Sequence, residues 1–340
     1  MHNFLSTKLY KKAYCSLCFI LLIFTLIGCG SNASESGNSE FSTLSESASG
    51  DSQAVTNAAT GDSQASNQPG SRDNTPHCLV PVADGNVTDG NELVSLDLSH
   101  ITDGYFMAQY LGTNNKVKMQ VTGPNDVTYT YNLGTNYDVF PFAAGSGTYV
   151  VGIHENISGT QYATIFNTNI DVTISNEFSP YLYPNQYVNF NKDSKVVALA
   201  SELAYPANDD ITVVTNIYNY MISNISYDYD KATTVEKGYI PEVDEILDTK
   251  KGICFDFAAA MASMLRSQRI PTRLEIGYAG EAYHAWISTY LDEIGWVNGI
   301  IEFDGENWQL MDPTFAASSS EENLKDFIGD GSNYVTKYIY

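Results

Sequence analysis

Positively charged side chains are scarce in this 340-residue chain, which has 17 lysines and arginines against 40 aspartates and glutamates. A chain with a formal net charge of −23 repels nucleic acid and anionic lipid head groups, so we expect no nucleic-acid partner. Histidine is also rare, at five residues, and the sequence contains no cluster of metal-ligand side chains. We therefore expect neither a metal nor another cofactor.

Cysteine is almost as rare. Cys15 and Cys18 lie in an N-terminal apolar segment, and Cys29 follows that segment directly. Only Cys78 and Cys254 remain for the folded part, so the chain lacks a disulfide framework. A bridge between these two residues would block the thiol of Cys254, for which we predict a chemical role, and we do not expect it.

A single uncharged apolar run, residues 13–28, follows three lysines near the N-terminus. An apolar segment this short behind a basic flank is typical of an export signal rather than a membrane span. Its end, residues 26–29, reads Leu-Ile-Gly-Cys and resembles the lipobox of bacterial lipoproteins. The resemblance implies cleavage before Cys29, lipidation of its sulfur and anchoring to the cell membrane on the extracytoplasmic face. An uncleaved signal anchor is the alternative.

Large apolar side chains are nearly absent from residues 29–77, which are rich in Ser, Gly and Asn. Such a segment cannot bury enough surface to offset the entropy of ordering it, so we predict a flexible tether. With the signal at residues 1–28, two folded regions remain, which we expect at residues 78–178 and 179–340.

Short segments of alternating polar and apolar residues, separated by turn sequences, fill residues 78–178. Residues 117–121 and 148–153 are two such segments, and residues 123–126, Gly-Pro-Asn-Asp, form one of the turns. This spacing predicts an all-β, immunoglobulin-like sandwich. We interpret it as a spacer or support for the second region, with glycan binding as the alternative.

Helical and strand patterns both occur in the second region. The helical patterns cover residues 194–204, 209–224 and 255–268, and the last is apolar nearly all round, as in a helix buried at the centre of a domain. The strand patterns cover residues 272–278, 283–290, 296–303 and 308–311. Together they predict an α+β fold in which a central helix packs against an antiparallel sheet.

Cys254, His284 and Asp312 occur in this order, at the start of the buried helix, the start of a strand and the end of another. A thiol needs a base to become a thiolate, and the base needs an acceptor that holds its ring. The helix N-terminus would stabilise a thiolate on Cys254, His284 would protonate the leaving amine, and Asp312 would fix the tautomer of His284. We predict these three residues as the catalytic set.

The surrounding residues carry weaker predictions. The backbone N–H of Cys254 is the expected first oxyanion donor, and Tyr227 is a candidate for the second. Tyr283 and Trp286 are candidate cleft residues, and a place in the core is the equal alternative for Trp286. Asp304 competes with Asp312, although its Asp-Gly sequence favours a hairpin turn. For four further residues we expect no part in catalysis. Asp256 is interpreted as a helix-terminal charge, and Arg266, Arg269 and Arg273 as solvent-exposed or paired with local acids.

Four linked motifs, residues 251–258, 265–273, 283–286 and 308–314, together resemble the transglutaminase-like superfamily of papain-like cysteine enzymes. With Tyr227-Asp228 the resemblance spans residues 185–340 and leaves the sandwich uncovered. It implies a papain-like transglutaminase core that transfers acyl groups through a cysteine thioester, as a protease, an amidohydrolase or a protein-glutamine acyltransferase. Exported bacterial members are often hydrolases, so hydrolysis of protein or cell-wall peptide amides is favoured over cross-linking. A non-catalytic surface lipoprotein that binds peptides is the alternative.

Overall fold

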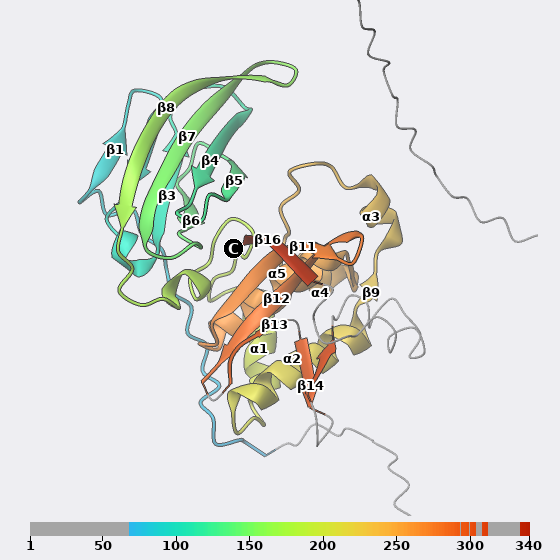
Figure 1. Ribbon diagram of the computed structural model, residues 1–340. Coiled ribbons are helices and arrows are strands. Elements are labelled where there is room, and N and C mark those ends of the chain that lie inside the picture. The colour runs from blue at the N-terminus through green and yellow to red at the C-terminus, as the bar shows by residue number, and fades with distance from the viewer. Residues whose placement is uncertain (1–67, 293, 299, 304–307, 312–333) are drawn as a thin grey trace, which may run out of the picture. The chain divides into compact units, whose positions relative to one another are not determined.

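The computed structural model describes residues 68–292, 294–298, 300–303, 308–311 and 334–340. Two four-stranded antiparallel sheets come first, with strand orders β1-β2-β3-β6 and β5-β4-β7-β8 (Figure 1). The first sheet comprises β1 (Thr88–Gly90), β2 (Val94–Asp97), β3 (Tyr105–Tyr110) and β6 (Asp138–Pro141), with the 3-10 helix η1 (Ile101–Asp103) before β3. The second comprises β4 (Val117–Thr122), β5 (Thr128–Asn132), β7 (Gly147–Ser158) and β8 (Gln161–Val172).

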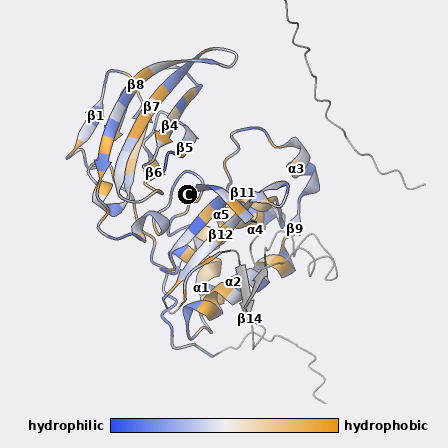
Figure 2. Cartoon of the chain, in the orientation of Figure 1, coloured by the Kyte–Doolittle hydropathy of each residue, from blue (hydrophilic) through white to orange (hydrophobic). Residues whose placement is uncertain are grey.

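Alternating burial along the strands explains why these residues form a sandwich. On β4, Val117, Met119 and Val121 are buried, whereas Gln120 between them is exposed. Figure 2 shows the same alternation as hydrophobic and hydrophilic bands along β7 and β8. Because successive strand residues point to opposite faces, one face of each sheet supplies the core. The predicted all-β sandwich is confirmed.

The second region begins with helices, after the 3-10 helix η2 (Ser179–Tyr181). They are α1 (Lys195–Ala204), α2 (Asp210–Asn224), α3 (Tyr229–Thr234), α4 (Glu245–Thr249) and α5 (Cys254–Ser267). Asp209 caps α2 by accepting from the backbone N–H of Thr212 at 2.7 Å. Every residue of α5 from Asp256 to Ser267 is buried, as the apolar pattern predicts. No helix in the described part of the chain is long and apolar enough to cross a membrane.

An antiparallel sheet packs against α5, with strand order β13-β12-β11-β16. Its strands are β11 (Thr272–Ala279), β12 (Ala282–Leu291), β13 (Gly295–Asn298) and β16 (Tyr334–Ile339). Two smaller pairs accompany it, β14 (Ile300–Phe303) with β15 (Trp308–Met311), and β9 (Ser226–Tyr227) with β10 (Lys251–Gly252). The predicted α+β layout, a central helix on an antiparallel sheet, is confirmed.

Two details of this sheet differ from the sequence predictions. The single strand expected over residues 296–303 is wrong, because β13 pairs with β12 while β14 leaves that edge and pairs with β15. The edge strand β16 has no counterpart among the predictions. Its residues 335–337 are all exposed, so it carries no alternating apolar pattern that could reveal it.

Arg266 is also placed differently from the prediction, which had it facing solvent or an acid. Its side chain is 1% exposed, and its guanidinium donates to three backbone oxygens. These belong to Thr272 at 2.9 Å, Tyr183 at 2.7 Å and Tyr340 at 2.7 Å. A buried charge of this kind needs every donor satisfied, and here it joins the helix, the interdomain connection and the end of β16.

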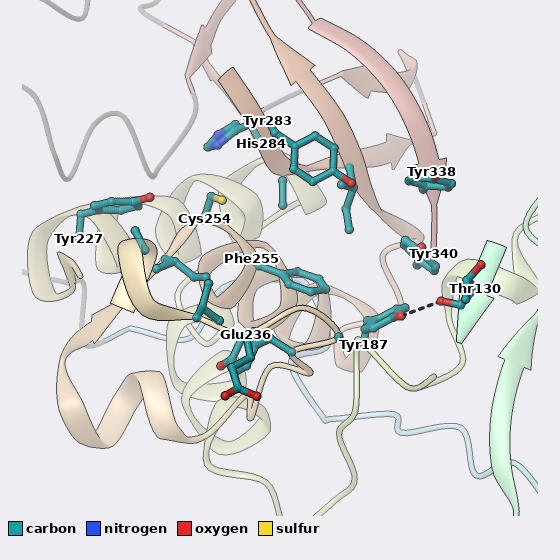
Figure 3. A pocket seen from close by; sticks show the side chains of 17 residues that line it. Thr130, Tyr187, Tyr227, Glu236, Cys254, Phe255, Tyr283, His284, Tyr338 and Tyr340 are labelled. Atoms are coloured by element: carbon teal, nitrogen blue, oxygen red, sulfur yellow. Dashed lines mark hydrogen bonds between the residues drawn. The ribbon is translucent and has the colours of Figure 1, made fainter. Parts of the chain in front are cut away.

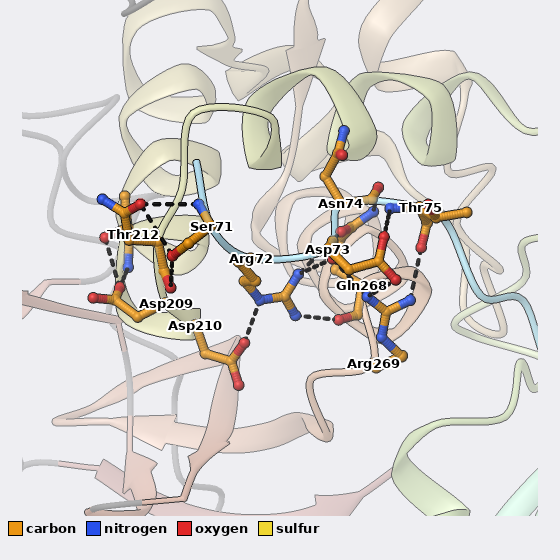
Figure 4. Close-up of polar contacts among 11 residues, drawn as sticks. Ser71, Arg72, Asp73, Asn74, Thr75, Asp209, Asp210, Thr212, Gln268 and Arg269 are labelled. Atoms are coloured by element: carbon orange, nitrogen blue, oxygen red, sulfur yellow. Dashed lines mark hydrogen bonds and ion pairs between the residues drawn. The ribbon is translucent and has the colours of Figure 1, made fainter. Parts of the chain in front are cut away.

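The predicted tether ends earlier than residue 77. Residues 70–77, hereafter the strap, lie along the helical region and are held there by hydrogen bonds (Figure 4). Arg72 binds the carboxylate of Asp210 at 2.5 Å and the carbonyl of Gln268, and Arg269 donates to the carbonyl of Thr75 at 2.8 Å. The strap is polar and can bury little apolar surface, which is why its composition predicts a flexible segment. Its side chains and backbone nevertheless form specific hydrogen bonds, which composition does not reveal. Residues 1–67, with the predicted signal and Cys29, lie outside the described residues.

The sandwich and the second region share one continuous core. Tyr340 packs edge-on against two sandwich residues, Tyr129 and Tyr131, with ring centroids 5.5 and 5.9 Å apart. Tyr187, from the connection between the regions, lies 4.7 Å from the ring of Tyr340. Aromatic pairs in these geometries contribute favourably beyond the area that they bury.

Candidate active site

Cys254 is the first residue of α5, and the preceding residue, Ile253, is extended with φ −93° and ψ 172°. The change from extended to helical backbone occurs at the cysteine, which is half-buried and carries a free thiol. The first N–H groups of a helix have no intrahelical partner and carry partial positive charge. The fold therefore holds this sulfur at the positive end of a buried helix.

Asp256, two residues further on, fixes this helix start. Its Oδ2 accepts from the backbone N–H of Ile253 at 2.9 Å, which makes it a helix-terminal charge as predicted. The same carboxylate accepts from the Tyr239 hydroxyl at 2.6 Å and forms an ion pair with Lys231 at 2.9 Å. Burial alone would lower the pKa of Lys231, but hydrogen bonds to Tyr239 and Asp256 raise it overall. The carboxylate beside Cys254 is therefore balanced by a cation.

A pocket of about 500 Å³ opens at Cys254 (Figure 3). His284 and two further predicted residues, Tyr227 and Tyr283, line it together with Cys254. In the view of Figure 3, Cys254 lies between Tyr227 and Tyr283, with His284 above it. The remaining described lining residues are Thr130, Tyr187, Ala232, Val235, Glu236, Gly238, Tyr239, Ile253, Phe255, Ile276, Ala285, Tyr338 and Tyr340.

His284 lies on β12 directly opposite Gly277 of β11. It is 6% exposed, and its ring stacks on that of Trp286 with centroids 6.3 Å apart. Gly277 cannot be replaced without displacing the sheet, because a Cβ there would lie 2.0 Å from the carbonyl oxygen of Val335 in β16. The close approach of three strands thus fixes the backbone across from His284.

The remaining predicted residues divide into two groups. Tyr283 is 60% exposed at the pocket, as a cleft residue should be, but Trp286 is 4% exposed and is not among the described lining residues. Trp286 instead packs edge-on against Tyr334 of β16, with ring centroids 5.0 Å apart, so of its two interpretations the structure favours a core residue over a cleft residue. Asp312 and its competitor Asp304 lie outside the described residues.

Several lining residues have no counterpart in the sequence predictions. Thr130 comes from β5 of the sandwich, Tyr187 from the connection, and Glu236 and Tyr239 from the loop between α3 and α4. They belong to segments far apart in the chain, and no motif marks them. The abundance of tyrosine, 24 residues, is the one sequence feature consistent with this aromatic lining.

Cys78, the second cysteine of the described part, provides a contrast to Cys254. It is half-buried, packs against the hydrophobic core and is a free thiol. Burial raises its pKa above the ordinary value of a thiol, because a low-dielectric surrounding disfavours the charged thiolate.

Comparison with known proteins gives a family match within the second region. Residues 197–299 match the model of the transglutaminase-like superfamily. A UPF0252 protein of Methanocaldococcus jannaschii is 27% identical over 143 residues, 38% of this chain and 39% of its own. The protein-glutamine gamma-glutamyltransferase of Pseudomonas aeruginosa is 29% identical over 108 residues, 27% of this chain and 14% of its own.

Among solved structures, the periplasmic domain of TgpA from Pseudomonas aeruginosa covers 67% of this chain and 95% of its own, at 16% identity and a TM-score of 0.29. A TM-score this low carries no argument about function. The chain spans about two fifths or less of the length of the curated relatives that it matches. Residues 197–299, which hold Cys254 and His284, are a transglutaminase-like domain.

Proposed function

We propose that the chain is a thiol enzyme that acts on peptide or side-chain amides through a thioester on Cys254, with hydrolysis favoured over cross-linking. The observation that supports this most directly is the joint position of Cys254 and His284 in one pocket, with Cys254 at the first turn of a buried helix. The match of residues 197–299 to the transglutaminase-like superfamily supports the same chemistry.

In the proposed reaction, the thiolate of Cys254 attacks the amide carbonyl carbon, and the carbonyl oxygen takes the negative charge. The backbone N–H of Cys254 and the hydroxyl of Tyr227 donate to that oxygen. His284 then gives its proton to the leaving amine, so that the C–N bond breaks and a thioester remains. Water, or a second amine, attacks the thioester while His284 takes up its proton, which releases the acyl product and the thiolate. Asp312 would hold the other ring nitrogen of His284.

The proposed place of action is the extracytoplasmic face of the cell membrane, with the enzyme held by a lipid on Cys29. The basic flank, the short apolar run and the Leu-Ile-Gly-Cys sequence support this. The proposed location also suggests the substrate class, which is a surface protein or a cell-wall peptide.

The test compares iodoacetamide alkylation of the two described cysteines within the full chain, resolved by mass spectrometry of their peptides. At neutral pH we expect Cys254 to react at least about tenfold faster than Cys78, because of the two thiols only Cys254 begins a helix and shares a pocket with a histidine. His284→Ala should reduce this difference sharply, because only the helix N-terminus then remains. His154→Ala is the control, because His154 lies on β7 of the sandwich, bonds to Thr164 and does not line the pocket.

Equal reactivity of the two thiols, or a Cys254 rate that ignores His284→Ala, would refute the activated pair and favour the non-catalytic peptide-binding lipoprotein. Where the pair is present, a glutamine-containing peptide distinguishes the acceptors. Ammonia release without incorporation of a fluorescent amine indicates hydrolysis, and incorporation indicates cross-linking.

A further inference from the structure

The pocket reaches from Cys254 to the sandwich, and aromatic rings connect its two ends. Figure 3 shows Cys254 and Thr130 at opposite sides of the view, with Phe255, Tyr187 and Tyr340 between them. The ring of Tyr187 lies 5.5 Å from that of Phe255 and 4.7 Å from that of Tyr340. A substrate that reacts at Cys254 can therefore extend along these rings as far as β5.

The loop between α3 and α4, residues 235–244, contributes a second wall that is fixed at two points. Asn132 of β5 donates from its side-chain amide to the carbonyl oxygen of Gly238 at 3.3 Å. The Tyr239 hydroxyl is bound to Asp256 at the start of α5, and its ring lies 6.3 Å from that of Phe255. Because the loop is fastened both to the sandwich and to α5, the space that it encloses is formed before a ligand enters.

Glu236 supplies the one carboxylate among the described residues that line this pocket. Glu236 is exposed and, within the part of the chain that the structure describes, forms no ion pair. Two lysines lie near the same loop. Lys231 on α3 is bound to Asp256 and lies over the ring of Tyr239, 4.6 Å from its centroid. The ammonium of Lys118 on β4 donates to the side chain of Asn132 beside Gly238. Neither ammonium forms an ion pair with Glu236, and no other described lining residue is an aspartate, a glutamate, a lysine or an arginine.

We propose that the sandwich end of the pocket is a subsite for a positively charged substrate side chain, recognised at a distance from the amide that Cys254 attacks. It is formed by Thr130, Tyr187, Glu236, Gly238, Tyr239 and Tyr340. A carboxylate together with aromatic ring faces attracts ammonium and guanidinium groups, whereas an anionic side chain is repelled. The inference rests on the proposed function in one respect, since Cys254 defines the reacting end. The sandwich is then part of the binding site rather than a spacer.

The test uses iodoacetyl-glycyl peptides that end in arginine amide or citrulline amide, with one to four glycines between the reactive group and that residue. Citrulline has nearly the shape of arginine without its charge, and arginine cannot serve as an acyl acceptor. Alkylation of Cys254 in the full chain is followed by mass spectrometry. We expect the arginine reagent of the best length to react about threefold to tenfold faster than its citrulline partner, the range for a partly exposed charge contact with rings.

Glu236→Gln should bring this ratio close to one, and Glu242→Gln should leave it unchanged. Glu242 is exposed in the same loop but does not line the pocket, so both variants change the net charge equally and only one changes the subsite. A ratio that Glu236→Gln and Glu242→Gln lower equally would mean attraction by the net negative charge alone and would overturn the inference. So would a ratio of one in the unsubstituted chain. Iodoacetamide itself reports the reactivity of Cys254 separately, so failure of the subsite is distinguishable from failure of the proposed function.

Discussion

At the residue scale, the ion pair between Lys231 and Asp256 connects stability with the state of the thiol. Asp256 is 3% exposed and accepts from the backbone of Ile253 and from Tyr239, so its carboxylate depends on Lys231 for charge balance. Breaking a buried pair by removing one partner is costly, because the other charge stays buried alone. An unbalanced carboxylate in the first turn of α5 would also repel a thiolate on Cys254.

Lys231→Met should therefore lower the free energy of unfolding by about 2 kcal/mol, less than for a fully buried pair because Lys231 is partly exposed. The same variant should slow alkylation of Cys254 at neutral pH. Urea unfolding and the iodoacetamide assay measure the two effects.

Adding Asp256→Asn to Lys231→Met should restore the alkylation rate, since the repelling charge is gone, even though stability is not fully recovered. Lys237→Met is the matched control, because Lys237 is exposed on the following loop and forms no ion pair with a described residue. If the single and double variants alkylate alike, Asp256 acts on the helix only structurally.

At the element scale, the strap fixes the beginning of the described chain to the helical region. Arg72 is the centre of these contacts, through its ion pair with Asp210 and its bonds to Gln268. Trypsin cleaves after arginine, but only when the bond can open away from its partners. The rate of cleavage after Arg72 therefore reports how often the strap detaches.

Asp210→Ala should increase tryptic cleavage after Arg72 by about fivefold, corresponding to an ion pair and hydrogen bond of about 1 kcal/mol. Asp193→Ala, which removes the partner of the exposed Lys192, should leave the rate unchanged. Digestion followed by mass spectrometry of the peptide that ends at Arg72 measures both. An unchanged rate in Asp210→Ala would mean that the backbone contacts of the strap hold it without the ion pair.

Comparison of individual elements shows where sequence reasoning succeeds. The pattern of α2 and its cap at Asp209 are local, so the residues themselves predict the helix and its start. The burial of α5 and the strands β11 and β12 are predicted in the same way. The position of the strap, the pairing of β16 and the presence of Thr130 and Glu236 in the pocket lining all depend on partners that are distant in sequence. The spacing of apolar residues does not predict which surface a polar segment or a loop will contact.

At the scale of the whole described chain, tyrosines hold the sandwich and the second region together. Tyr129 of β5, Tyr187 and Tyr340 meet in edge-on pairs at this seam, and the buried Tyr131 lies against them. Because the core is continuous and the described residues from 68 onward belong to one compact unit, we expect both regions to unfold in a single transition.

The stability that these tyrosines contribute should decrease at alkaline pH, because their pKa values are raised in the folded chain. Burial raises the pKa of Tyr129 and of Tyr187 to about 12, whereas an unfolded tyrosine ionises near about pH 10. The unfolded chain therefore releases these protons first, so the stability that they contribute is complete below about pH 10 and is lost as the pH rises toward about 12. The loss should be on the order of 1 kcal/mol for each of the two between about pH 9 and about pH 11.

Urea unfolding at a series of pH values, with tyrosinate absorbance as a second probe, measures this decline. Tyr129→Phe with Tyr187→Phe should flatten it, because phenylalanine keeps the ring packing and has no proton to lose. Tyr162→Phe, on the exposed side of β8, should retain the full pH dependence. A decline as steep in the double variant as in the unsubstituted chain would mean that other groups limit alkaline stability. Two separate transitions at any pH would contradict the shared core itself.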